Sequence, residues 1–116
     1  MSITADMIRG NTDAIILARL VDGDSYGYRI NAAIKKATDN RYELKEATLY
    51  TAFRRLEEAG YITSYWGDEE SGARRRYYKI TDRGIEAYRR MVLDLQSAYE
   101  LIFKLVDDKS AVTEGI

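Results

Sequence analysis

The chain has 116 residues, of which 46% are hydrophobic and 32% charged, and its formal net charge is -1. This length predicts a single domain, and the composition is typical of soluble proteins. Cysteine and histidine are both absent, which excludes disulfides, thiol nucleophiles, Cys-ligated zinc, the usual general base and the commonest transition-metal ligand. Paired carboxylates can still hydrolyse glycosides, but acids spread along the chain are more typical of a solvated surface. We therefore expect no enzyme, metal or cofactor.

No signal pattern and no apolar run of about 18 residues occur, so we expect a cytoplasmic protein without a membrane partner. The charge, however, is unevenly distributed. The segment 74–90 is basic, with Arg74, Arg75, Arg76, Lys79, Arg83, Arg89 and Arg90 against Asp82 and Glu86. From residue 91 onward acids predominate, with Asp94, Glu100, Asp107, Asp108 and Glu114 against Lys104 and Lys109. A local basic cluster can bind phosphates within a nearly neutral protein, so the basic segment indicates nucleic acid.

Three helices are predicted in the first half of the chain. Apolar positions at helical spacing predict a first helix that ends near Asp22 and Gly23: Ile8, Thr12, Ile15, Ile16 and Leu20. Ser25 is a favourable N-cap for a second helix over about residues 26–37. The residues expected to face inward from it are Ile30, Ala33, Ile34 and Ala37. A third helix, over about residues 45–58, has an apolar stripe of Leu49, Phe53 and Leu56, and Gly60 follows as its stop.

A hairpin and a long helix are predicted next. Residues 61–66 are rich in β-branched and aromatic types, residues 67–72 are turn-forming, and residues 74–80 form the second strand. From about Asp82 the apolar positions follow steps of three and four residues: Ile85, Tyr88, Val92, Leu95, Tyr99, Ile102 and Val106. Such a heptad seam spans roughly 37 Å at ~1.5 Å per residue, longer than a small domain can cover. Its first turns can serve as core, but its later turns require a partner chain, most simply in a two-fold homodimer.

The order of helix, helix, helix, hairpin and long helix is that of a winged helix-turn-helix. We therefore expect a mainly α fold with a small β-hairpin. Residues 1–81 form the DNA-binding domain, residues 82–107 the dimerisation helix and residues 108–116 a flexible tail. Aromatic residues of the hairpin, Trp66 and Tyr65 opposite Tyr77 and Tyr78, are expected to pack within the wing.

Two surfaces carry the predicted chemistry. Small and hydroxyl residues near the start of the third helix let its backbone approach the major groove, where Thr side chains can contact bases. The alternative is a merely solvated face. In the hairpin, alternation puts Arg74 and Arg76 on one face and Arg75 on the other, so that at least one face can follow the DNA backbone or enter the minor groove. The alternative, compatible with the first, is that these arginines pair with Asp68, Glu69 and Glu70. The predicted DNA-contacting residues are Tyr26, Ala47, Thr48, Tyr50, Thr51, Arg54, Gly72, Arg74, Arg75, Arg76 and Lys79.

Several of these segments resemble the PadR family of regulators, particularly its short members with one C-terminal helix. The matching segments are residues 46–51 (EATLYT), 55–57 (RLE), 65–69 (YWGDE), 72–78 (GARRRYY) and 80–84 (ITDRG), and the resemblance extends over residues 7–106. It implies a repressor of a nearby efflux-pump or detoxification gene, and a dimer held by the first and last helices. The expected interface residues are Ile8, Ile15, Ile85, Val92, Leu95, Tyr99, Ile102 and Val106.

The resemblance also implies an effector that releases the protein from DNA. In multidrug-binding members a tryptophan of each last helix sandwiches planar drugs in a central pore. That tryptophan aligns with Leu95, and an acid one turn later aligns with Tyr99, so the stacking slot is not carried over. The pore-facing positions are Met7, Gly10, Ala14, Leu17, Ala18, Tyr88, Val92, Leu95 and Tyr99. They can bind a small hydrophobic effector or simply fill the interface.

Three functions remain open. The leading one is a dimeric regulator that binds double-stranded operator DNA, with or without a small-molecule pocket. The second is a winged helix that binds proteins and not DNA. The third, a carboxylate enzyme, requires two acids that converge in a cleft.

Overall fold

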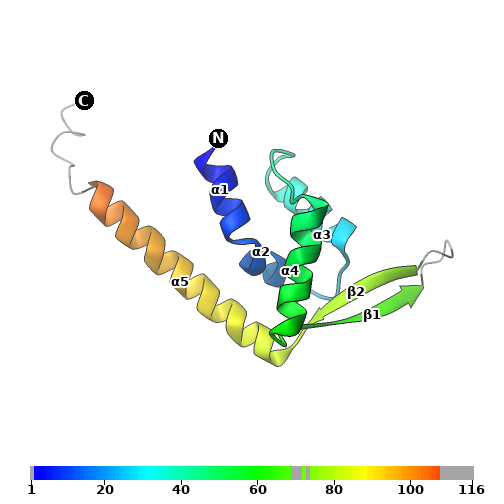
Figure 1. The fold of residues 1–116 in the computed structure, drawn as a ribbon. Coiled ribbons are helices and arrows are strands. Elements are labelled where there is room, and N and C mark those ends of the chain that lie inside the picture. Colours follow the sequence, from blue (N-terminus) through cyan, green and yellow to red (C-terminus); the bar gives the residue numbers. More distant parts are fainter. Residues whose placement is uncertain (1, 69–71, 73, 108–116) are drawn as a thin grey trace.

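The computed structural model describes residues 2–68, 72 and 74–107. The elements in chain order are α1 (Ile3–Gly10), α2 (Thr12–Val21), α3 (Gly27–Ala37), α4 (Glu46–Glu58), β1 (Ile62–Asp68), β2 (Arg74–Ile80) and α5 (Asp82–Asp107). Figure 1 shows a small helical body from which the β1–β2 hairpin projects on one side and α5 on the other. This arrangement confirms the predicted fold class, a winged helix-turn-helix with a long last helix. The expected tail over residues 108–116 lies outside the described residues.

The predicted single first helix is wrong, because the chain forms two helices that meet at Asn11. Asn11 has φ -118° and ψ 27°, and its side-chain Nδ2 donates to the carbonyl of Met7 at 2.7 Å. Thr12 Oγ1 likewise donates to the carbonyl of Arg9 at 2.8 Å. Asn and Thr side chains that bond nearby carbonyls compete with the helical hydrogen bonds. The apolar spacing continues across the break and therefore conceals it.

The second helix begins differently from the prediction. Its N-cap is Tyr26, without a side-chain capping bond, and α3 starts at Gly27. Ser25 instead pairs with β2, because its backbone exchanges two hydrogen bonds with Tyr78, at 3.1 and 2.7 Å. The inward positions Ile30 and Ile34 are confirmed as buried, but Ala37 is exposed. Ser25 thus forms an isolated β-bridge beside the two-stranded hairpin and does not cap α3.

The core lies where α2, α3 and α4 meet the base of the hairpin. The predicted stripe of α4 is confirmed, since Leu49, Phe53 and Leu56 are all at most 2% exposed. Tyr78 of β2 stacks on Phe53 with 3.8 Å between the ring centroids. The other members of the core are Ile16, Leu17, Leu20, Ile30, Ile34, Leu44, Ala52 and Ile62. Burial of this set anchors the hairpin to the helices.

The hairpin is antiparallel, with Ile62 opposite Ile80 at its base and Asp68 opposite Arg74 at its outer end. The first strand extends to Asp68, beyond the predicted end at residue 66. Gly67 leaves room for the ring of Tyr77 on one face of the hairpin, because a Cβ there would lie 2.6 Å from Tyr77 Cε1. The hairpin is the wing of the fold.

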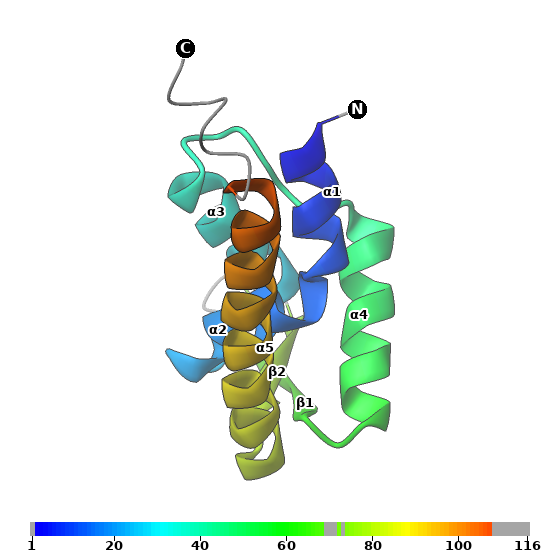
Figure 2. The same cartoon turned by 90° about the vertical axis from the view of Figure 1, so that its left-hand side faces the viewer.

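The long helix α5 is tied to the body only over its first turns. Thr81 Oγ1 accepts a hydrogen bond from the Gly84 amide at 3.0 Å and donates to the Gly60 carbonyl at 2.7 Å. Gly84 packs so closely that a Cβ there would lie 2.1 Å from the carbonyl oxygen of Tyr61. Beyond Leu95 every described residue of α5 is exposed. Figure 2, which views α5 from its free side, shows the helix lying across the front of the body.

Candidate nucleic-acid interface

Side-chain hydrogen bonds hold the turn between α3 and α4, and two of them come from Asn31. Asn31 of α3 donates to the carbonyl of Leu44 at 2.7 Å and accepts from the Leu44 amide at 2.8 Å. Asp39 and Asn40 adopt left-handed backbone conformations, with φ of 53° and 63°, which these two residue types tolerate better than most. The two helices of the helix-turn-helix therefore meet at a defined angle.

The outward face of α4 is polar and exposed. Its members recur at steps of four, three and four residues and are Ala47, Thr51, Arg54 and Glu58. Tyr50 lies on the flank nearest α3, where its hydroxyl approaches Gly27 so closely that a Cβ there would lie 3.1 Å from it. Its ring is 46% exposed and packs edge-on against Phe53. Ala47, Tyr50, Thr51 and Arg54 thus share one surface, as predicted.

Thr48 is not part of that surface. It is half-buried on the opposite flank of α4, where it lines a small groove with Ala5 and Ile8 of α1. The same flank carries Arg55, which forms an ion pair with Asp13 of α2. This hydrogen-bonded pairing raises the pKa of the Arg55 guanidinium. The flank near Thr48 therefore serves contacts within the body.

One face of the wing carries Arg74, Arg76 and Trp66, in agreement with the predicted alternation. The guanidinium carbon of Arg74 lies 5.2 Å from the centroid of the Trp66 ring, and Arg74 Nε lies 3.5 Å from Asp68 Oδ1. The pairing of Arg74 with Asp68 confirms part of the predicted alternative; Glu69 and Glu70 lie outside the described residues. Arg74 remains 64% exposed, so solvent screening leaves this ion pair weak and the guanidinium accessible.

Arg76 is engaged more fully than Arg74. Its Nη2 donates to Ser64 Oγ at 2.8 Å and lies 3.4 Å from Glu57 Oε1 of α4. Ser64 Oγ in turn donates to Glu57 Oε2 at 3.0 Å. The sequence prediction missed Glu57 and Ser64, because they lie far from Arg76 along the chain.

The other face of the wing carries an aromatic cluster with two cations. The rings of Tyr65 and Tyr77 are stacked at 5.5 Å, and Tyr77 contacts Tyr26 edge-on at 5.2 Å. Arg75 lies 4.6 Å from the Tyr26 ring centroid. Arg29 of α3, which was not among the predicted DNA-contacting residues, lies 4.9 Å from the same centroid. Packing within the wing is thereby confirmed for Tyr65 and Tyr77, whereas Trp66 is 56% exposed.

The Tyr65 hydroxyl ties this face to the chain before α3. It donates to Asp24 Oδ2 at 2.6 Å, and this hydrogen bond raises the pKa of the Tyr65 phenol.

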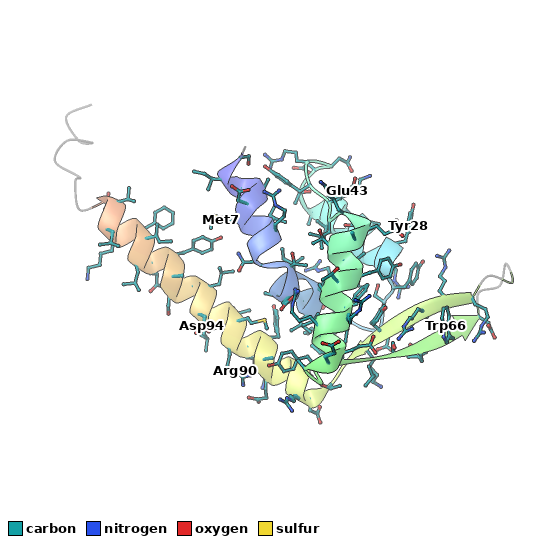
Figure 3. All side chains as sticks on the ribbon, viewed as in Figure 1. Met7, Tyr28, Glu43, Trp66, Arg90 and Asp94 are labelled. Atoms are coloured by element: carbon teal, nitrogen blue, oxygen red, sulfur yellow. The ribbon has the colours of Figure 1, made fainter. Side chains whose placement is uncertain are left out.

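Two further predicted residues, Lys79 and Gly72, are exposed on the wing, and Gly72 has a φ of 86°. Figure 3 shows Trp66 near the outer end of the wing and Tyr28 on the same side of the body. Tyr28 is 77% exposed and was not among the predicted residues. A lone aromatic residue on a polar helix face was the sequence feature that could have identified it.

The positions predicted for a dimer interface fall into two groups. Those near the body, Ile8, Ile15, Ile85, Val92 and Leu95, are half-buried. Those on the distal part of α5, Tyr99, Ile102 and Val106, are 36%, 53% and 69% exposed. Exposed apolar residues are not confined to the seam there, because Leu101, Phe103 and Leu105 are more than 60% exposed. The distal part of α5 is therefore an unusually apolar helix surface.

The predicted ligand positions are only partly brought together. A groove of about 480 Å³ between the α1–α2 junction and α5 includes Gly10, Ala14 and Leu95 from the predicted set. Its lining also carries four charged side chains, Arg9, Asp13, Arg55 and Asp94. The half-buried Met7, Ala18, Tyr88 and Val92 and the more exposed Tyr99 do not line it. Leu17 is wrong as a ligand-facing position, because it is fully buried in the core.

A larger groove, of about 610 Å³, lies between α3 and α4 and was not predicted. Tyr28 and Tyr50 border it together with lysines of α3 and acids of the turn and of α4. Within residues 2–68, 72 and 74–107, no group of three or more acidic side chains gathers closely enough to hold a metal ion. Nor does any helix in the described ranges have the length and apolarity needed to cross a membrane.

Comparison with known proteins agrees with this geometry. Residues 16–90 match the model of the transcriptional regulator PadR-like family. A transcriptional regulator from Clostridium thermocellum is 48% identical, with a TM-score of 0.81 over 90% of this chain and 99% of that one. An uncharacterized protein from Lysinibacillus sphaericus is 40% identical over 100 residues, which cover 86% of this chain and 92% of its own. Bacillus subtilis PadR in complex with operator DNA is 22% identical, with a TM-score of 0.62 over 70% of this chain and 46% of that one, and shares the fold.

Proposed function

The chain belongs to the PadR-like family of transcriptional regulators, and we propose that it is a homodimeric repressor that binds operator DNA. The observation that carries this proposal is the pairing of an exposed polar face on α4 with an arginine-bearing wing that projects from the foot of the same helix (Figure 1). A helix and a β-ribbon held in this way can contact a major groove and the adjacent backbone together.

In the proposed complex α4 enters the major groove. Thr51 and Arg54 are exposed on the outward face of α4, and the small side chain of Ala47 lets the helix backbone approach the bases. Thr can donate or accept and can touch a thymine methyl group, while Arg can bond guanine. Tyr50 reaches a phosphate or a base edge beside them. Sequence preference would thus arise from α4.

The wing supplies contacts to the DNA backbone. Arg74 is exposed and its local partner, Asp68, is 84% exposed, so exchange of this weak ion pair for a phosphate costs little. Arg75, Lys79 and Gly72 lie on the same hairpin, and Tyr26 supports Arg75 from the body. Such contacts add affinity that does not depend on base sequence and that falls as salt increases.

Dimerisation would place two copies of α4 on one duplex. The distal part of α5 exposes an apolar surface with heptad spacing, and α5 has 26 residues. A two-fold dimer built on it would read two inverted half-sites about 34–36 Å apart. Bacillus subtilis PadR, which shares the fold, has been solved in complex with operator DNA, and this supports DNA binding by the fold. Bound at a promoter, such a dimer would block transcription of a nearby transporter or detoxification gene, as in a multidrug response.

A small hydrophobic effector would release the dimer. The groove beside α5 is the available site on one protomer, and a partner helix would complete it. An effector must bind better to a dimer whose α4 helices no longer match the operator spacing, since equal binding to both states changes nothing. A regulator without this pocket is the alternative, in which a partner's side chains fill the groove.

The test is selection of duplexes from a random library by the full chain, together with sedimentation. We expect enrichment of a palindrome and a dimer at micromolar concentration. Comparison of the selected palindrome with the sequence upstream of the chain's own gene and its neighbours would identify the regulated gene. A salt-insensitive or absent DNA signal would overturn the proposal and favour a protein-binding winged helix.

A further inference from the structure

Three polar side chains join the last turn of α4 to both strands of the wing. Ser64 Oγ of β1 donates to Glu57 Oε2 at 3.0 Å, and Arg76 Nη2 of β2 donates to Ser64 Oγ at 2.8 Å. Arg76 Nη2 lies 3.4 Å from Glu57 Oε1 and closes the triangle. The serine hydroxyl donates to one partner and accepts from the other. We refer to Glu57, Ser64 and Arg76 as the strut.

The strut lies where the apolar attachment of the wing ends. Tyr78, opposite Ser64 in the strand register, is 3% exposed and stacks on Phe53 of α4. On that face of β2 the next residue outward is Arg76, whose guanidinium carbon is 5.9 Å from the Tyr78 ring centroid and 6.0 Å from that of Trp66. Trp66 is more than half exposed. On this face, apolar packing holds the base of the hairpin and the strut joins the part beyond it to α4. On the opposite face, Tyr65 and Tyr77 contact Asp24 and Tyr26, which precede α3.

A two-stranded hairpin by itself is only marginally stable in water, so its direction depends on such contacts. If the wing moved freely relative to α4, ordering it on DNA would reduce affinity, whereas a wing already held in place avoids that loss. Resting on the proposed function, we propose that the strut positions the wing relative to α4 for DNA binding. Arg76 is then a positioning residue, and phosphate contact is left to the other wing cations.

If the strut orients the wing, Glu57 should affect DNA affinity in the direction opposite to that expected from its charge. A carboxylate near the DNA surface repels phosphates, so its removal should tighten binding if charge alone mattered. If Glu57 orients the wing through Ser64 and Arg76, its removal should weaken binding instead. Ser64→Ala separates the two readings further, because it breaks the strut without changing any charge. Thr63→Ala is the matched control, since Thr63 is the exposed neighbour of Ser64 on the opposite face of β1.

The experiment measures binding of the full chain to a duplex selected by the wild-type chain, over a series of salt concentrations. We expect Glu57→Ala to weaken binding about two- to tenfold and Ser64→Ala by a smaller factor, both with an unchanged salt slope. Arg76→Ala should weaken binding as much as Glu57→Ala does. The double variant Glu57→Ala/Arg76→Ala should bind DNA no more weakly than either single variant. Tighter binding by Glu57→Ala, with a salt slope flattened by about one in Arg76→Ala, would overturn the proposal.

A readout without DNA separates failure of the strut from failure of the proposed function. Trp66 is the sole tryptophan of the chain and lies on the wing. Time-resolved anisotropy of Trp66 in the free chain should show added fast motion in Glu57→Ala and Ser64→Ala, but not in Thr63→Ala. Equal decays in all four proteins would exclude a strut even if every variant binds DNA. A wild-type chain that enriches no duplex would remove the proposed function, while the anisotropy would still decide whether the strut holds the wing.

Discussion

The wing and the distal part of α5, residues 96–107, both project from the body, in opposite directions (Figure 1). They differ in how far their side chains find partners within the same chain. In the wing, Arg74, Arg76 and Tyr65 each have a polar partner within the same chain. In distal α5, Ile102 and Val106 are more than half exposed, and apolar side chains gain nothing from water. The polar groups of the wing therefore find partners within one chain, whereas distal α5 leaves an apolar surface uncovered, which is the surface assigned to the partner in the proposed dimer.

The largest expected effect comes from a charge placed on α5. Leu95→Asp or Ile102→Asp should convert a dimer into a monomer, because a carboxylate would be buried at the interface without a partner. Leu93→Asp is the control, since Leu93 is 63% exposed and lies off the heptad seam. Sedimentation at micromolar concentration measures the assembly. A wild-type chain that sediments as a stable monomer would remove the proposed contrast between α5 and the wing.

The next effect concerns the wing cations. The double variant Arg74→Ala/Arg75→Ala should weaken binding to selected and random duplexes alike, and should flatten the salt dependence by about one unit per lost phosphate contact. The control Arg89→Ala/Arg90→Ala removes the same charge from α5. Figure 3 shows Arg90 on the side of the body away from the wing. Binding titrations at several salt concentrations provide the slopes. An unchanged slope in the wing variant would show that the arginines serve local pairing.

A smaller and more selective effect is expected on α4. Thr51→Ala or Tyr50→Ala should lower the preference for the selected duplex over random sequence by ~1–3 kcal/mol if a base contact is lost. Thr48→Ala is the control from the same helix, because Thr48 lies against α1. Competition binding against both duplexes measures the preference. Equal losses on the two duplexes would reassign Thr51 or Tyr50 to positioning on the backbone, and a loss in Thr48→Ala would restore its predicted base contact.

The smallest signal is expected from planar cationic dyes. Leu95 and Tyr99 stand where drug-binding relatives are expected to carry a tryptophan and an acid, so Hoechst-type dyes lose a stacking partner and a counter-charge. Calorimetry should show weak binding by the wild-type chain, while neutral apolar compounds, or anionic ones that use Tyr88 or Tyr99 as a phenol partner, bind better. Leu95→Trp/Tyr99→Asp should gain dye affinity. Micromolar dye binding that persists in Leu95→Ala and in Trp66→Phe would contradict this view of the groove.

Local patterns predicted the elements with most success where one face of an element is buried. The stripe of α4 and the alternation of the wing arginines were both predicted correctly, because a buried face imposes its period on the sequence. The break at Asn11 was missed, since the apolar period runs through it and the side-chain bonds that cause it carry no period. The capping role given to Ser25 failed for a related reason, because its true partner, Tyr78, is distant in the chain.

The features of the candidate site also fall into those that local sequence patterns predict and those that depend on the fold. Residue types and their spacing were enough to predict that a basic hairpin follows a polar-faced helix and that α5 carries a heptad seam. Three other features became visible only in the folded chain: Thr48 lies against α1, Leu17 belongs to the core, and Arg76 contacts Glu57 and Ser64. These outcomes depend on how helices and strands distant in sequence pack, which sets the flank of each element that is covered. Spacing within one element carries no information about its neighbours in space.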